Sequence, residues 1–269
     1  MPPNTEDWTI VRITRNTEER LKLWAIMSVA TPGDIIRMRE YADAMGKDIM
    51  VRSVNEDGES ILYRAAGLLS PEHLKVVIEM GGDVNKCNER GVSPLHALFL
   101  YTSNYASPAA LEKAERKLAI LLEAGADIDR YSYMYDSPIV LAFRRGVTHP
   151  VIVQLCEQLL MKGPDLNNHS LQDPTALCWL AKWTDDPRVL EHLLDCYPEQ
   201  VPIDGVNYAG ETAIFFSTPK MLPHFFNRNA NLDIRNEKNQ NAVDVQKELV
   251  DAETFAKWIA IWNIEKDRR

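Results

Sequence analysis

The chain has 269 residues, of which 45% are hydrophobic and 26% are charged, a balance typical of a soluble globular protein. Its 39 acidic residues outnumber its 30 basic residues and give a formal net charge of -9. Proteins that bind DNA or RNA usually carry a basic excess, because neutralising phosphates supplies much of their affinity. The charge therefore argues against nucleic acid as a partner, and the acidic surface fits either a basic protein partner or simple solubility.

No targeting or membrane segment is expected. The first residues lack a basic stretch followed by an apolar core, and no run of eighteen or more apolar residues could span a bilayer. The four cysteines (Cys87, Cys156, Cys178 and Cys196) are spread along the chain without paired spacing. Such cysteines are typical of free thiols in a reducing compartment, so we expect a cytoplasmic protein.

Proline recurs before segments with helical periodicity. The pairs are Thr31-Pro32, Ser70-Pro71, Ser107-Pro108, His149-Pro150, Asp186-Pro187 and Thr218-Pro219. Proline is favoured at the first helical position, and Ser, Thr or Asp before it caps the helix. Each pair therefore predicts the start of a helix, once per structural unit. Gly81, Gly125, Gly163 and Asn229 follow the apolar ends of four of these helices and predict left-handed helix stops.

A second recurring phrase precedes each of these helices. It occurs as Gly58-Glu59-Ser60-Ile61-Leu62, again around Ser93, Ser137 and Thr175, and as Gly210-Glu211-Thr212-Ala213-Ile214. Ser60 and Ser93 are 33 residues apart, and the occurrence around Ser93 reads Gly91-Val92-Ser93-Pro94-Leu95-His96-Ala97. The end of the helix that follows it reads Leu121-Leu122-Glu123-Ala124-Gly125-Ala126-Asp127-Ile128. In length and in amino-acid sequence these segments resemble the ankyrin repeat. Met80-Gly81-Gly82-Asp83-Val84-Asn85 is a third segment similar to that family.

The resemblance implies an all-α fold, a solenoid of helix-turn-helix units with short hairpin fingers, capped at both ends. We expect an N-terminal arm and capping unit over residues 1–53, with the cap itself at 17–45. Repeats are expected over 54–245 and a C-terminal capping helix over 246–269, centred near 251–263, in one continuous domain. An insertion near 101–110 should form a loop followed by a long helix over 108–123. Residues 147–150 should form a second insertion.

Proteins of this family usually bind partners through the finger tips and the exposed side of the first helix, a concave face. Carried over position by position, the resemblance places the following residues on that face: Glu56, Asp57, Glu59, Glu89, Arg90, Tyr131, Tyr133, Met134, Tyr135, Asp136, Arg144, Arg145, Lys182, Trp183 and Tyr208. Tyr131, Tyr133 and Tyr135 alternate, so in an extended segment they would share one side. They either contact a partner, as Tyr and Arg often do, or pack on one another to stiffen the finger.

No catalytic site, metal site or cofactor is expected. His192 and Cys196 lie four residues apart but lack further ligands, and His96 stands where the family places a structural histidine. A pair formed by Cys178 and His169 has ordinary explanations as core and loop residues.

The leading hypothesis is a monomeric, non-catalytic module that binds another protein and masks or inhibits it. An immunity protein that neutralises a toxin and a secreted effector that acts on host proteins are both compatible with it. A ligand-binding or enzymatic module in the N-terminal 50 residues or the insertion remains as an alternative of another class.

Overall fold

A computed structural model describes residues 32–55, 57–102, 108–145, 150–166, 176–184 and 186–268. The arm and most of the expected N-terminal cap lie outside these ranges. In the described part, the regular elements are helices, together with one isolated antiparallel bridge between Val54 and Ser60. The predicted all-α fold class is confirmed for this part of the chain.

The chain divides into two compact units, Met1–Tyr133 and Met134–Arg269. The helices of the first unit are α2 (Pro32–Met45), α3 (Lys47–Arg52), α4 (Ile61–Leu68), α5 (Pro71–Glu79), α6 (Pro94–Thr102) and α7 (Pro108–Glu123). Those of the second are α8 (Pro138–Arg145), α9 (Pro150–Leu160), α10 (Ala176–Trp183), α11 (Pro187–Cys196), the 3-10 helix η1 (Ala213–Phe216), α12 (Leu222–Asn227), α13 (Ala242–Leu249) and α14 (Ala252–Lys266).

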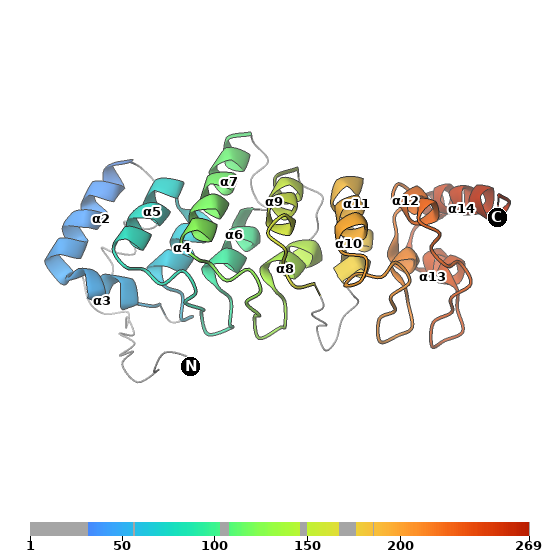
Figure 1. Ribbon diagram of the computed structural model, residues 1–269, viewed down its shortest axis with the longest axis horizontal. Helices are drawn as coiled ribbons and strands as arrows, with labels where there is room; N and C mark the ends of the chain where they lie inside the picture. Colours follow the sequence, from blue (N-terminus) through green and yellow to red (C-terminus); the bar gives the residue numbers. More distant parts are fainter. Residues whose placement is uncertain are drawn as a thin grey trace. The chain divides into compact units, whose positions relative to one another are not determined.

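Each unit stacks pairs of helices. In the first unit, α4 packs on its partner α5 and on the next first helix α6, while α5 packs on α7. In the second, α8 packs on α9 and α10, and α10 packs on η1. Within each unit the first helices form one row and the second helices another (Figure 1). We use "first helices" for α4, α6, α8, α10, η1 and α13, and "second helices" for α5, α7, α9, α11, α12 and α14.

The helix starts follow the prolines, with one exception. Helices begin at Pro32, Pro71, Pro108, Pro150 and Pro187, and the side chains of Ser70 and Asp186 accept hydrogen bonds from the backbone of α5 and α11. The predicted start at Pro219 is wrong, because α12 begins at Leu222. A helix from Pro219 would place Pro223 in its interior, where proline removes a backbone hydrogen bond and clashes with the preceding turn.

The predicted helix stops are confirmed. Gly81, Gly125, Gly163 and Asn229 all have positive φ, between 57° and 94°. In two of these ends the chain closes with a backbone bond back into the helix, from Gly82 N–H to the Val77 carbonyl (3.0 Å) and from Ala126 N–H to the Leu121 carbonyl (2.9 Å). The short links from the second helix of one repeat to the finger of the next repeat are set in this way.

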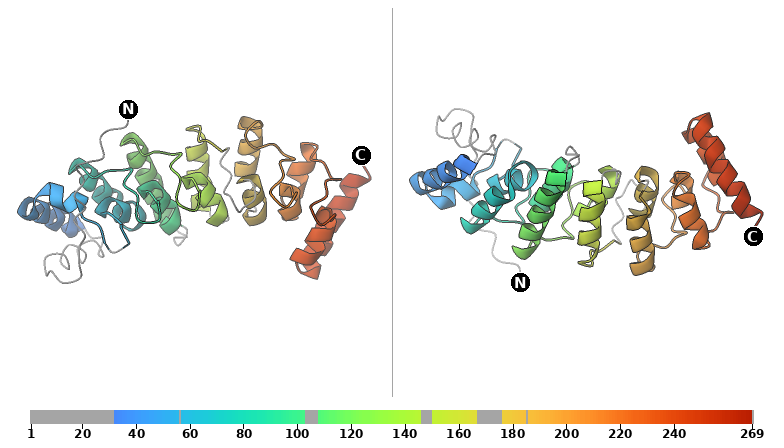
Figure 2. Two further views of the ribbon diagram at one scale, coloured as in Figure 1. Left: turned by 90° about the horizontal axis from the view of Figure 1, so that it is seen from below. Right: turned by 90° about the horizontal axis from the view of Figure 1, so that it is seen from above.

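The second unit ends in a helix that covers its last repeat. α14 lies at the C-terminal end of that unit, oblique to α12 (Figure 2), and extends three residues beyond the predicted 251–263. Trp258 is fully buried, stacks on Trp262 with ring centroids 4.8 Å apart, and donates its indole N–H to the Ser217 carbonyl (3.0 Å). The predicted cap thus closes the core with two tryptophans. At the other end, α3 is a short helix that the sequence did not predict.

The long second helix of the insertion is confirmed, since α7 has 16 residues and α5 has 9. Residues 103–107 of the expected loop, and 147–149 of the other insertion, lie outside the described residues. α7 carries Lys117, which is 7% exposed and donates from Nζ to the carbonyls of Ala66 (3.0 Å) and Gly67 (3.4 Å) at the end of α4. Burial lowers the pKa of Lys117 to about 8.

Candidate functional site: the finger tips and the first helices

The fingers are built on one repeated turn. In four of them an asparagine opens the turn, and its side-chain oxygen accepts hydrogen bonds from the backbone two and four residues later. For Asn88 these donors are Arg90 N–H (2.9 Å) and Val92 N–H (3.0 Å). The other three asparagines are Asn55, Asn207 and Asn236. Such a side chain replaces the hydrogen bonds that a backbone turn would supply, which makes the tip rigid.

The fourth residue of each turn must adopt a left-handed backbone. Gly58, Gly91 and Gly210 stand there with φ between 72° and 75°, and Asn239 stands there with φ 62°. Glycine and asparagine tolerate this region, whereas a bulky side chain is strained in it. The Asn-x-x-Gly spacing was present in the sequence, but its role as a finger tip was missed.

The finger of residues 132–136 departs from this chemistry. Tyr133 N–H donates to the Arg90 carbonyl (2.9 Å), as Glu89 N–H donates to the Asp57 carbonyl one finger earlier (3.1 Å). This register places Ser132 at the asparagine position and Tyr135 at the glycine position, where Tyr135 has φ 60°. A left-handed residue with a side chain costs about 1–2 kcal/mol. The boundary between the two units falls inside this finger, after Tyr133.

The predicted alternation of the tyrosines is wrong. Residues 133 and 134 form a turn and Tyr135 is left-handed, so Tyr131, Tyr133 and Tyr135 are not on one side of an extended segment. All three are nevertheless exposed, at 38%, 72% and 48%, and Met134 is 57% exposed. At the tips of the neighbouring and last fingers the same positions hold charged residues, Glu89 with Arg90 and Glu237 with Lys238. The finger of residues 132–136, called the middle finger below, therefore offers an apolar, aromatic tip.

The other predicted binding residues fall into three groups. Asp57, Glu89, Arg90, Lys182 and Tyr208 are exposed. Glu56 lies outside the described residues, as do the side chains of Arg145 and Trp183.

Glu59 and Asp136 form the third group, and the expectation that they lie on the surface is wrong. The fifth residue of a finger turns back toward the first helix, so Glu59 pairs with Arg64 (3.1 Å) and the buried Asp136 pairs with Arg144 (2.8 Å). Both carboxylates therefore brace a finger against its own helix.

The first helices of the second unit bring cations onto aromatic rings. The Arg144 guanidinium of α8 lies 5.8 Å from the ring centre of Trp179 on α10. The Lys182 ammonium, one turn after Trp179, lies 5.9 Å from that ring and 5.9 Å from the ring of Phe216 on η1. Distances below about 6 Å are those of attractive cation–π contacts. Trp179 and Phe216 were missed as surface residues by sequence reasoning, although each is the fourth residue of its helix.

The second helices use their charges between repeats. In the first unit Arg39 pairs with Glu79 (3.0 Å) and Arg116 with Glu72 (2.6 Å). In the second unit His224 contacts Glu191 (2.8 Å) and Arg228 contacts Asp195, each across 33 residues. Exposed pairs of this kind contribute roughly 0–1 kcal/mol each. They align neighbouring repeats, so this side of each unit is engaged within the chain.

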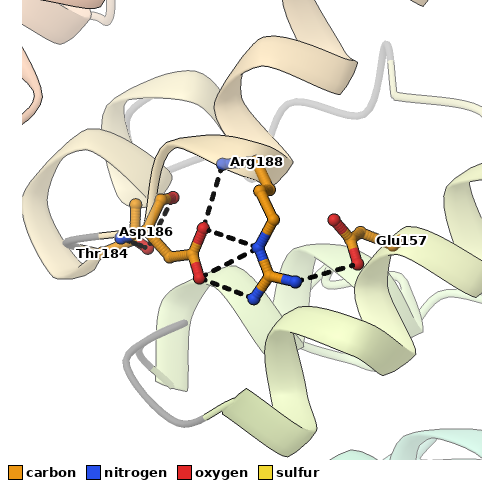
Figure 3. A network of polar contacts seen from close by, with 4 residues as sticks. All are labelled: Glu157, Thr184, Asp186 and Arg188. Atoms are coloured by element: carbon orange, nitrogen blue, oxygen red, sulfur yellow. Dashed lines mark hydrogen bonds and ion pairs between the residues drawn. The ribbon is translucent and has the colours of Figure 1, made fainter.

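One such network joins α9 to α11 (Figure 3). Arg188 donates from Nη2 to Asp186 (2.7 Å) and reaches Glu157 of α9 at 3.9 Å. The Arg188 side chain holds the pKa of Asp186 below its usual value. Asp186 also accepts the Arg188 backbone N–H (3.1 Å), so one carboxylate both caps α11 and orients the arginine that ties it to the preceding repeat.

Of the residues considered for chemistry, His96 and Cys178 are buried, whereas Cys196 is exposed. His96 is fully buried and its Nδ1 contacts Ser93 Oγ (2.8 Å), which confirms its structural assignment, and the equivalent Ser70–His73 contact is also 2.8 Å. Cys156 and Cys178 are buried, and His169 lies outside the described residues. Within the described ranges, no group of three or more His, Cys, Asp or Glu residues could hold a metal ion.

No family model and no curated protein sequence matches the chain. Solved structures do match. One is a chain of the complex between the predatory endopeptidase Bd0816 of Bdellovibrio bacteriovorus and immunity protein Bd3460, with 20% identity, TM-score 0.59 and coverage of 76% of this chain and 98% of that one. The human ASB11 ankyrin repeat domain gives 19% identity, TM-score 0.66 and coverage of 88% and 96%.

The ankyrin repeat domain of Bcl-3, an IκB protein family member, gives 13% identity and TM-score 0.60 and covers 92% of this chain and 100% of that domain. This chain has the ankyrin-repeat fold. Its turns at Asn55, Asn88, Asn207 and Asn236 are therefore ankyrin fingers, and α4, α6, α8 and α10 are ankyrin first helices. Among the helices of the described ranges, none is long and apolar enough to cross a bilayer.

Proposed function

We propose that this ankyrin module binds a partner protein through its finger tips and first helices, and that it masks the surface it covers. The observation that carries the proposal is Tyr135. A strained tyrosine stands where the other described fingers use glycine or asparagine, and it is half exposed at the tip. Strained residues persist where function requires them, and exposed tyrosines are frequent binding hot spots.

Two further observations support a partner at the finger tips and first helices. Charged side chains of the second helices form ion pairs between repeats. In the middle finger, by contrast, Tyr133 and Met134 are each more than half exposed. Apolar side chains that are exposed next to one another often mark an interaction site.

Inhibition is the finer form of the proposal. The same fold occurs in the complex of a predatory endopeptidase with immunity protein Bd3460. A module of rigid fingers that covers an enzyme surface would block access without chemistry of its own. We therefore propose a non-catalytic inhibitor or immunity-type protein, acting as a monomer that covers one partner.

The test is affinity capture from the cells that make the protein, with three purified baits. The first is wild type, and the second carries Tyr133→Ala and Tyr135→Asn. The third carries Met161→Ala and Ile264→Ala, which removes exposed apolar side chains away from the fingers (76% and 55% exposed). All three should give the same helical circular dichroism.

We expect one abundant protein to co-purify with wild type and with the Met161/Ile264 bait and to be lost with the finger variant. If the captured protein is an enzyme, an equimolar amount of wild type should inhibit it. Retention of the partner by the finger variant would reject the finger as the binding surface. Capture without inhibition of an enzyme partner would reject masking while leaving recognition in place.

A further inference from the structure

Three first helices of the second unit, α8, α10 and η1, differ in charge from the rest of the chain. The helices α8, α10 and η1 contain three basic residues and no acidic one, in a chain whose formal net charge is -9. The neighbouring second helices carry Glu157 on α9 and Glu191 and Asp195 on α11. The part of the row formed by α8, α10 and η1 therefore has an excess of basic residues, whereas α13, the last first helix of the unit, carries Asp244, Lys247 and Glu248.

The side chains on that row repeat with helical register. Trp179 and Lys182 are the fourth and seventh residues of α10, Arg144 is the seventh residue of α8, and Phe216 is the fourth residue of η1. Residues three apart lie on the same side of a helix. We call Arg144, Trp179, Lys182 and Phe216 the basic–aromatic stripe. Its cation-to-ring distances of 5.8–5.9 Å link three successive first helices.

The stripe holds its cations in place. Asp136 accepts one hydrogen bond from Arg144 Nη1 (2.8 Å) and is itself buried, so the guanidinium is anchored from the finger side while 30% of its side chain stays exposed. Lys182 is exposed, between the Trp179 and Phe216 rings. Cations positioned beforehand lose less conformational freedom on binding an anion, and apolar rings beside them lower the local dielectric constant.

The first unit lacks this arrangement. At the corresponding fourth and seventh positions α4 has Arg64 and Gly67, and α6 has Ala97 and Leu100. Arg64 is turned to Glu59 (3.1 Å), and a side chain at Gly67 would meet the Tyr101 ring at 2.4 Å. The basic–aromatic stripe is thus a property of the second unit and not a general feature of the repeats.

We infer that the basic–aromatic stripe binds a carboxylate-bearing segment of the partner protein, with Arg144 and Lys182 pairing acidic side chains and Trp179 and Phe216 covering the apolar side chains between them. This inference rests on the proposed protein-binding function and specifies the chemistry of the partner. Arginine donates to carboxylates in a planar fork, and lysine attracts them as a point charge. A nucleic acid strand draws its affinity from many phosphate contacts, whereas the stripe offers two cations, one of which Asp136 already pairs.

The test selects peptides from a displayed library of random dodecamers on the purified full chain. The probe is then a synthetic copy of the most enriched peptide, measured by fluorescence anisotropy against wild type, Lys182→Glu and Lys257→Glu. Lys182→Glu reverses a charge in the stripe at an exposed position. Lys257→Glu makes the same charge change on α14, where Lys257 is exposed and pairs only locally with Glu253 (2.7 Å) among the contacts described.

We expect the enriched peptides to carry at least about twice the Asp and Glu content of the unselected library. The Lys182→Glu variant should weaken binding of the chosen peptide by about tenfold or more, because opposite charges become like charges. Lys257→Glu should leave the affinity within about twofold, since interactions beyond a Debye length are screened.

Enriched peptides without an acidic excess, or equal binding by Lys182→Glu, would overturn the inference and leave protein binding itself intact. Failure to enrich any peptide would also overturn it, because an exposed stripe that takes a linear segment must select one. The proposed function is judged separately by the capture experiment. Displacement of the peptide by a single-stranded oligothymidine of equal charge would show that the stripe recognises polyanions, which contradicts the inference.

Discussion

Tyr135 occupies the position in its finger that Gly91 occupies one finger earlier, and the two residues share a left-handed backbone, with φ 60° and 72°. The hydrogen bond from Tyr133 N–H to the Arg90 carbonyl fixes this correspondence. Glycine meets the requirement of the turn without strain, whereas tyrosine meets it at a conformational cost. We propose that contact with a partner protein offsets this cost.

Gly91→Ala should destabilise the protein more than Gly125→Ala. Both glycines have positive φ, so each substitution carries the left-handed penalty of about 1 kcal/mol. A Cβ at Gly91 would also lie 2.9 Å from the Tyr133 nitrogen, whereas one at Gly125 meets nothing within 4 Å. Urea denaturation followed by circular dichroism should give the lower unfolding free energy for Gly91→Ala. Equal losses would mean that the fingers move apart without resistance.

Tyr135→Gly should leave the free energy of unfolding at or above the wild-type value. Relief of about 1 kcal/mol of left-handed strain offsets the contacts that the half-exposed ring gives up. The same urea titration measures it, with Tyr208→Gly as a control. The Tyr208 ring is 70% exposed, but its backbone is not left-handed, so its replacement brings no relief. A loss of more than about 2 kcal/mol in Tyr135→Gly would identify the ring as a structural support, by the scale of side-chain burial.

The unfolding free energy should rise with pH above about 8 because of Lys117. Burial lowers its pKa from 10.5 to about 8 in the folded chain, so the folded chain binds this proton less tightly than the unfolded chain. Below about 8 both states are protonated and the full cost of the buried charge is present. Between about 8 and 10.5 the unfolded state binds more protons, and stability increases by at most about 1.4 kcal/mol per pH unit.

Lys117→Met should remove that rise, and Lys257→Met, at an exposed position of α14, should keep it. The measurement is a series of urea titrations from pH 7 to pH 10, compared as differences between each variant and wild type. A wild-type slope that survives in Lys117→Met would assign the pH dependence to other groups.

Trp258→Ala should lower the free energy of unfolding by about 3–5 kcal/mol, the range for removing a large buried aromatic ring. Trp258 is fully buried and holds the Ser217 carbonyl, so its loss opens the last repeat as well as a cavity. Thermal unfolding by calorimetry would show it, with Ile264→Ala on the same helix as a control. Ile264 is 55% exposed, and its truncation should change stability by less than about 0.5 kcal/mol.

The sequence predicted those parts of the fold that depend on local backbone chemistry. Proline after a capping residue begins α5 and α11, and Gly81 and Gly125 end their helices, because one or two residues decide such features. Pro219 misled the prediction because a second proline, Pro223, moves the helix start by almost a turn. The short helix α3 was missed because it has no proline or capping side chain before it.

The candidate site was only partly accessible from sequence. Gly91 stands two residues before Ser93, which precedes α6, and Tyr135 stands two residues before Ser137, which precedes α8. Comparison of these positions would have shown that a tyrosine replaces the glycine, but the three tyrosines were interpreted as an alternating strand. The burial of Glu59 and Asp136 depends on how the finger folds back onto its helix, which spacing does not reveal. Trp179 and Phe216 belong to the candidate site because cations of neighbouring helices contact their rings, and the sequence does not show which helices are neighbours.

The most direct test of the account is the affinity of the captured partner, once purified, for wild type and for Tyr135→Gly, measured by isothermal titration calorimetry. The account predicts that the variant folds at least as stably as wild type and binds about 30-fold or more weakly, the loss of a hot spot worth about 2 kcal/mol. Unchanged affinity, with folding intact, would contradict the claim that a partner is the reason for the strained tyrosine.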